Sequence, residues 1–211
     1  MSETSRFPSI AKLERRMRPG GYSTQGFLGP IESLQVVIAR DQETLENLGV
    51  SHEEIAEALE NILQVVKEQI SQLLQFRQRG EKVQEYRKRG EEYSARSVHI
   101  PDLYHHESIP SFSLENLPSV DQGYLVGNKF HVFIAQYRGL QECPWECEHE
   151  EWSSFDFLLL NREIGEYVTG PGMIVHLLRK HHFFEGLESP YRVDPARAVR
   201  VLGLGSNTTI K

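Results

Sequence analysis

The sequence predicts an α+β protein. Its first half is expected to form an antiparallel helical hairpin, and its second half a small antiparallel β-sheet with a zinc-stapled helix. Apolar residues recur at helical spacing over residues 31–78, whereas β-branched and aromatic residues with tight-turn signals dominate residues 124–169. A third observation concerns metal binding. Cys143 and Cys147, the two cysteines of the chain, precede histidines on a predicted helix, and this is the donor set of a tetrahedral zinc site.

The composition is that of a globular protein large enough for a hydrophobic core in one or two domains. Of its 211 residues, 39% are hydrophobic and 25% charged. The net charge of -7 disfavours general affinity for nucleic acids or anionic membranes. No apolar run approaches the length of a membrane span, and residues 1–6 lack the hydrophobic stretch of a secretory signal. We therefore expect a soluble cytoplasmic protein with reduced thiols and no membrane partner.

The N-terminal residues are expected to form a flexible arm, because prolines and repeated glycines disfavour a long helix or a central strand there. The arm either wraps a partner subunit through Tyr22, Phe27 and Leu28 or is a loosely packed leader. We divide the chain into an arm at 1–29, a helical hairpin at 30–96, an irregular connector at 97–122 and an antiparallel sheet with the zinc-bearing helix at 123–211.

Two helices are predicted after the arm. Pro30 suits a first helical position, and Gly49 is placed to end that helix. Ser51 and Glu54 then form the pattern of a capping box at the start of a longer helix, which reaches about Gln78. The very short connection between the helices predicts an antiparallel hairpin. The apolar positions are Ile31, Leu34, Ile38, Leu45 and Leu48 in the first helix, and Ile55, Leu59, Ile62, Val66, Ile70, Leu73 and Leu74 in the second.

A homodimer through the helical half is expected, because Leu63, Leu74 and Phe76 add more apolar surface than one partner helix covers. The alternative is that these residues pack on the protein's own C-terminal half. Residues 77–96 carry seven basic and four acidic side chains with two tyrosines among them, so they could bind nucleic acid. A solvated helix is the favoured interpretation, since the interspersed acids repel phosphate.

The connector holds a second group of histidines. His99, His105 and His106, with Glu107, lie among prolines that break any long element. Histidines and a carboxylate on a loop could leave a metal coordination position open for water, and this is the basis of an alternative function as a metal-dependent hydrolase. A surface loop that contains histidines is the simpler interpretation, because the spacing matches no motif with a known mechanism.

The last segment is predicted to hold two β-hairpins and two helices. The first hairpin turns at Gly127-Asn128, and the second pairs residues 155–160 with 166–169. A helix follows from Met173 to about His182, and a short helix begins at Asp194-Pro195.

The candidate metal ligands are Cys143, Cys147, His176 and His181. The two histidines are five residues apart, and about 140° apart on a regular helix, so the helix must widen or tighten near its end for both to reach one ion. His182 and His149 are therefore alternative ligands. Metal-free packing of these residues and a Cys143–Cys147 disulfide are the other interpretations of the pattern.

The order of a cysteine knuckle, a hairpin and a helix with two late ligands resembles the treble-clef class of zinc modules, and less closely a two-Cys two-His ββα finger. The resemblance covers residues 143–182, with three rather than two residues between the cysteines. Two thiolates and two imidazoles complete a tetrahedron, so the implied zinc is structural. Glutamates that crowd the cysteines could suit a basic protein partner. We therefore expect a non-enzymatic binding or regulatory protein.

Overall fold

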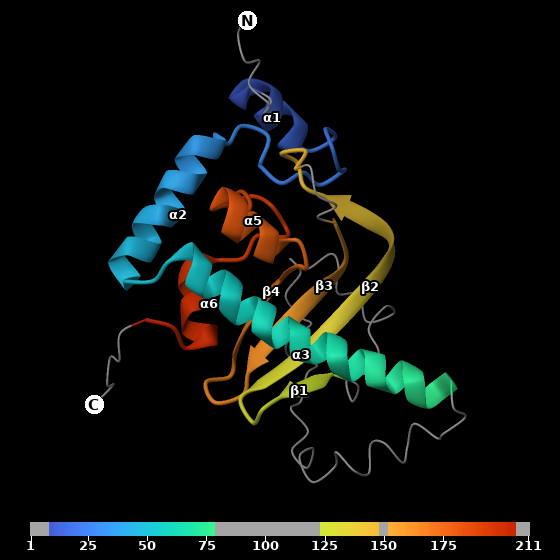
Figure 1. Ribbon diagram of the computed structural model, residues 1–211. Helices are drawn as coiled ribbons and strands as arrows, with labels where there is room; N and C mark the ends of the chain where they lie inside the picture. The colour runs from blue at the N-terminus through green and yellow to red at the C-terminus, as the bar shows by residue number, and fades with distance from the viewer. Residues whose placement is uncertain (1–8, 79–122, 148–151, 206–211) are drawn as a thin grey trace, which may run out of the picture.

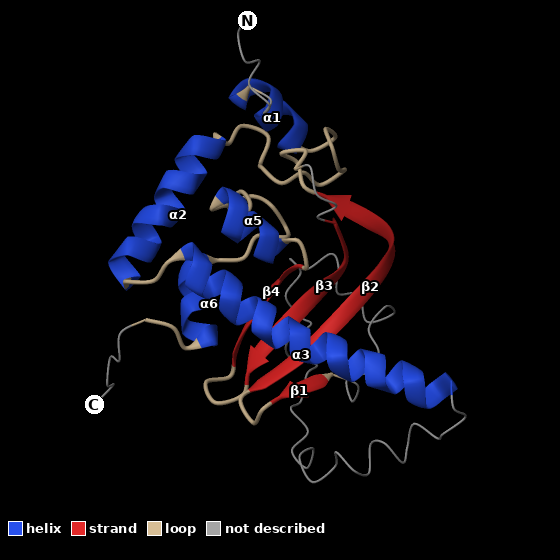
Figure 2. Ribbon diagram, viewed as in Figure 1, coloured by secondary structure: helices blue, strands red, loops and turns tan. Residues whose placement is uncertain are grey.

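The computed structural model describes residues 9–78, 123–147 and 152–205, and over these residues it has an α+β fold (Figures 1 and 2). This confirms the predicted fold class. The described elements are α1 (Ile10–Met17), α2 (Leu34–Leu48), α3 (His52–Gln78), β1 (Tyr124–Val126), β2 (Phe130–Glu142), β3 (Trp152–Asn161), β4 (Glu166–Pro171), α5 (Ile174–His181) and α6 (Pro195–Leu202).

The sheet is an antiparallel meander in the order β1-β2-β3-β4. The first hairpin turns through Gly127, whose φ of 59° is a conformation that glycine adopts without strain. The second hairpin pairs Asn161 with Glu166. Both predicted hairpins are therefore confirmed. The pairing of β2 with β3 shifts register between Gln136 and Gln141, and β2 curves before its end (Figure 1).

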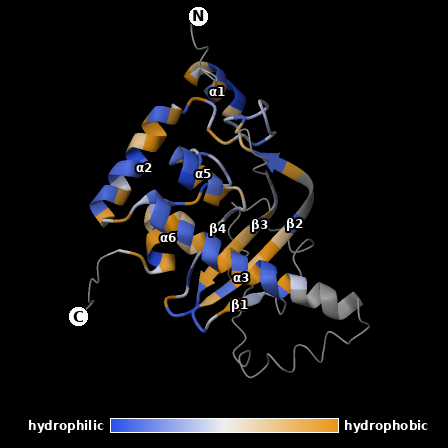
Figure 3. Ribbon diagram, in the orientation of Figure 1, coloured by the Kyte–Doolittle hydropathy of each residue, from blue (hydrophilic) through white to orange (hydrophobic). Residues whose placement is uncertain are grey.

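The sheet is buried on both faces. Val132 and Phe157 belong to the core that the strands share with the helices, while the next residues, Phe133 and Leu158, are also buried and alternate to the opposite face. Figure 3 shows the central strands coloured mostly as hydrophobic, whereas the helices mix hydrophobic and hydrophilic residues. Such strands read as continuous apolar runs.

The start of α2 differs from the prediction. The helix begins at Leu34 after Ser33, and Pro30 lies in a turn before it rather than in its first helical position. The Glu32 carboxylate holds this turn, because it accepts hydrogen bonds from the backbone N–H groups of Gly29 (2.6 Å) and Leu187 (2.7 Å). Ile31, expected on the apolar stripe, is consequently 88% exposed.

The capping box at the start of α3 is confirmed. The Glu54 backbone N–H donates to the Ser51 hydroxyl (3.2 Å), and the Ser51 backbone N–H donates to the Glu54 carboxylate (2.8 Å). The helix then continues to Gln78, as predicted. Within the part of the chain that the structure describes, no helix combines the length and the apolar character needed to span a membrane.

The antiparallel hairpin packing of α2 and α3 is not confirmed. After the short turn the two helices diverge: α2 lies against α6, and α3 lies across α5, α6 and β1 (Figure 1). Apolar residues of both helices are buried in one core shared with the C-terminal half, which includes Leu45, Leu59, Val66, Leu177 and Val199. The C-terminal half thus buries apolar side chains of α2 and α3 that a hairpin of these two helices alone would leave exposed.

The segment expected to be an arm contains a helix, α1, whose Leu13 and Met17 are buried. The chain after it folds back, because the backbone N–H groups of Phe27 and Leu28 both donate to the Met17 carbonyl, at 2.6 and 3.1 Å. Phe27 and Leu28 are buried in the protein's own core. The described part of the segment is therefore packed against the rest of the chain, and the proposed domain boundaries stay predictions.

Candidate metal centre

The two cysteines are held by a tight turn directly after β2. The backbone N–H of Glu146 donates to the Cys143 carbonyl at 3.1 Å, and Pro144 occupies the second turn position, where its fixed φ fits. Glu146 has a φ of 55°, in the left-handed region that lets the chain reverse. Both thiols consequently face the same side, with their Sγ atoms 3.6 Å apart.

The two histidines are carried by α5, which ends in a left-handed cap at His182, where φ is 52°. The backbone N–H of His182 reaches the carbonyl of Leu177, five residues back, as well as that of Leu178. The N–H of Phe183 also donates to the Leu177 carbonyl, at 3.2 Å. These bonds are the pattern that ends a helix, and they do not widen the turn between His176 and His181. The two imidazole rings nevertheless meet, with their centroids 5.2 Å apart.

Cys143, Cys147, His176 and His181 each place one donor atom within 4.8 Å of the other three. Both sulfurs lie 3.3 Å from Nε2 of His181. Around a tetrahedral zinc ion, two sulfurs would be about 3.8 Å apart and a sulfur and a nitrogen about 3.6 Å. The four residues are therefore close enough to hold one metal ion, with spacings close to those of a zinc site.

Burial determines the protonation state of the metal-free site. It raises the pKa of the Cys143 thiol to about 12 and lowers the pKa of the His181 imidazole to about 4. The imidazole is thus neutral and ready to coordinate, whereas the thiol must exchange its proton for a cation. The Trp145 indole stacks on the His181 ring with centroids 3.9 Å apart and planes 4° apart, and so covers the site.

The structure also bears on the alternatives for this site. Both cysteines are free, so the disulfide interpretation is not what the structure shows. His182 is exposed and stacks on His52, with ring centroids 4.5 Å apart, and it is not in the four-residue cluster. His149, the other alternative ligand, lies outside the described residues. Of His181 and His182, it is therefore His181 whose imidazole lies close to the two cysteines and His176.

The structure does not describe the two other sites predicted from the sequence, the hydrolase alternative and the candidate nucleic-acid segment. His99, His105, His106 and Glu107 of the hydrolase alternative, and residues 79–96 of the candidate nucleic-acid segment, lie outside the described residues.

Sequence reasoning missed the part that the N-terminal residues play around the cysteines. Arg16 forms an ion pair with Glu146, and the Tyr22 hydroxyl hydrogen-bonds to the Glu142 carboxylate. These contacts join residues at least 120 positions apart, and no local pattern marks them.

Comparison with protein-family models, with curated proteins and with solved structures finds no match for this chain. The donor set and its geometry are therefore what indicates a metal site. The order of knuckle, antiparallel hairpin β3–β4 and helix α5 is the one that the treble-clef resemblance implies.

Proposed function

We propose that this protein binds one zinc ion through Cys143, Cys147, His176 and His181 and acts as a non-enzymatic binding or regulatory protein whose fold the ion stabilises. The convergence of four donor atoms within 4.8 Å carries the proposal. Thiolate and imidazole ligands in a tetrahedral arrangement favour zinc over calcium or magnesium, which prefer oxygen. The ion would join the turn after β2 to α5.

A structural role fits this donor set better than a catalytic one. Catalytic zinc keeps one coordination position for water, whereas four protein donors fill the tetrahedron. Cys143 is 5% exposed, His176 is buried, and Trp145 lies flat on His181, which limits access to the ion. A zinc ion here would therefore add stability by linking two segments that are 29 or more residues apart in the chain.

The test is the zinc content of protein purified without added metal. We expect about one zinc per chain, lost in Cys143→Ser and His176→Ala together with a melting temperature lower by several degrees. His182→Asn is the matched control, because it removes a neighbouring imidazole outside the cluster and asparagine tolerates the left-handed conformation there. Metal-free wild-type protein, or unchanged zinc content in both ligand variants, would refute the proposal.

The homodimer through the helical half and the cytoplasmic location stay predictions. Of the three residues that led to the dimer prediction, Leu63 is buried in the protein's own core. The side chains of Leu74 and Phe76 lie outside those that the structure describes. Sedimentation equilibrium at several protein concentrations measures the oligomeric state directly.

A further inference from the structure

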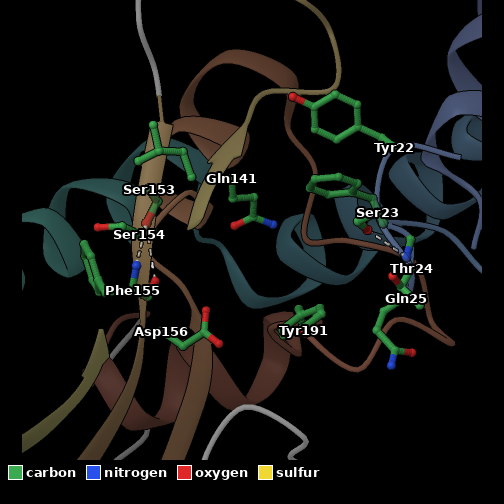
Figure 4. Close-up of a pocket in the computed structure, with 13 residues that line it drawn as sticks. Tyr22, Ser23, Thr24, Gln25, Gln141, Ser153, Ser154, Phe155, Asp156 and Tyr191 are labelled. Carbon is green, nitrogen blue, oxygen red and sulfur yellow. Dashed lines mark hydrogen bonds between the residues drawn. The ribbon is translucent and has the colours of Figure 1, made fainter. Parts of the chain in front are cut away.

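A pocket of about 450 Å³ lies between the loop after α1 and the ends of β2 and β3 (Figure 4). Such a volume is in the range that small organic ligands occupy. In Figure 4 the strand residues lie on one side and the loop residues on the other. The carboxylate of Asp156 and the amide of Gln141 are directed into the hollow between them. None of the four candidate metal ligands lines this pocket.

The lining is selective in charge. Asp156, which is 7% exposed, is the ionisable carboxyl group among the lining residues of the described chain, and none of those residues is a lysine, arginine or histidine. The Asp156 charge also acts on its surroundings, since it contributes, after burial, to raising the pKa of the Tyr191 phenol. An anion would be repelled here, whereas a cation would be attracted in a partly desolvated site.

The remaining lining suits an apolar body next to that cation. Phe27, which is 1% exposed, belongs to the lining, and the Tyr22 and Tyr191 rings contribute aromatic surface (Figure 4). Leu140, at 60% exposure, adds an apolar side chain from the end of β2. Aromatic rings favour the approach of cations as well as of apolar groups. The Gln141 amide oxygen can accept a further hydrogen bond from a ligand.

We propose that this pocket binds a small organic cation, with an ammonium or amidinium group against Asp156 and an apolar body against Phe27, Leu140 and Tyr191. A carboxylate has about four lone-pair directions, so Asp156 can accept from a ligand while it keeps interactions within the protein. The binding site goes beyond the proposed zinc function, because none of its lining residues is a candidate metal donor.

Three probes of one shape test the charge preference: benzylamine, benzyl alcohol and benzoate, which are positive, neutral and negative at pH 7. Isothermal titration at low ionic strength, with the full chain as purified, measures each affinity. We expect saturable binding of benzylamine at least about tenfold tighter than that of the alcohol, and no binding of benzoate. Equal affinity for the amine and the alcohol, or no saturable binding of benzylamine, overturns the proposal.

Variants test the location of the site. Asp156→Asn is expected to remove the preference of benzylamine over benzyl alcohol. Leu140→Arg places a positive charge at a lining position that is 60% exposed, where solvent can accommodate the charged group, and is expected to weaken benzylamine binding about tenfold. Glu163→Gln removes one exposed negative charge outside the lining and serves as the control. Benzylamine affinity unchanged in Leu140→Arg, or weakened equally in Glu163→Gln, contradicts this placement.

Discussion

Glu185 is a fully buried carboxyl group in the segment after α5. One of its oxygens accepts a hydrogen bond from the Ser189 hydroxyl at 2.5 Å, and the other has no hydrogen-bond partner among the described residues. Burial raises the pKa of this carboxyl to about 8, and the charge of Asp156 contributes in the same direction. Glu185 is therefore protonated, and uncharged, in the folded protein at neutral pH.

This shift predicts how stability depends on pH. The folded protein holds the Glu185 proton up to about pH 8, whereas the unfolded chain releases it near 4.5. The stabilising contribution is thus present below pH 4.5 and is lost as pH rises through 8, with a slope of about 1.4 kcal/mol per pH unit between these values. Glu185→Gln should remove that slope.

Urea denaturation of both proteins at several pH values between 5 and 9 measures the difference in unfolding free energy. The glutamine variant should gain stability relative to the wild type as pH rises, because glutamine does not ionise. Other titrating groups are common to both proteins and cancel in the difference. Parallel pH curves for the two proteins would show that Glu185 ionises normally.

Among the elements, α2 is joined to the segment before α6 by a buried ion pair. Both guanidinium Nη atoms of Arg192 donate to the two carboxylate oxygens of Asp41, at 3.0 and 2.5 Å. The side chains are 12% and 2% exposed. Arg192 also donates to the Glu185 carbonyl. Removal of one partner would leave a buried, uncompensated charge.

Arg192→Met should therefore lower the unfolding free energy by about 3–5 kcal/mol. The matched control is Arg200→Met, which breaks the ion pair with Glu166, whose partners are 54% and 42% exposed, and should cost less than about 1 kcal/mol. Chemical denaturation of both variants measures the two losses. Equal losses would mean that burial adds nothing to the Asp41–Arg192 pair.

Local signals predicted most element boundaries, and distant contacts determined the rest. The Ser51–Glu54 capping box and the Asp194 cap of α6, whose carboxylate accepts from the Arg197 N–H, depend on residues three apart. The start of α2 depends instead on Glu32 and Leu187, which are 155 positions apart. A pattern within one segment cannot show such a contact, and the sequence pattern therefore predicts that Pro30 lies in the first turn of the helix.

Contacts between residues far apart in the sequence also determine how α2 and α3 are oriented and why α1 belongs to the folded core. Periodicity identified which faces of α2 and α3 are apolar, but not which element covers them. The structure assigns α6 and α5 to that role, together with the sheet. Helix α1 has only eight residues in a stretch rich in glycine and proline, and its buried Leu13 and Met17 gain their partners only when the whole core is assembled.

At the scale of the whole molecule, the convergence of the four candidate metal ligands could be predicted from the sequence, and the pocket could not. Donor identity and order marked Cys143, Cys147, His176 and His181 within about forty residues. The pocket joins residues 22–27 to strand ends and to Tyr191, which have no shared motif. Only the folded structure brings these segments together and places the pocket next to the cysteine turn.

The end of β2 contributes to the pocket and leads directly into the turn that carries the candidate metal ligands Cys143 and Cys147. Leu140 and Gln141 line the pocket, and the chain reaches Cys143 two residues later. The opposite wall is tied to the same turn, since Arg16 pairs with Glu146 and Tyr22 bonds to Glu142. An ion that fixes the turn would therefore also fix both sides of the pocket.

If both proposals hold, removing zinc should weaken benzylamine binding at least about fivefold, because the free chain must first order the walls of the pocket. Titration before chelation, after it and after zinc is restored measures the coupling. Circular dichroism should show that helix content is kept, since α2, α3 and α6 carry none of the four candidate ligands. Unchanged benzylamine affinity in metal-free, folded protein would mean that the turn holds its shape without zinc, and that the two sites act independently.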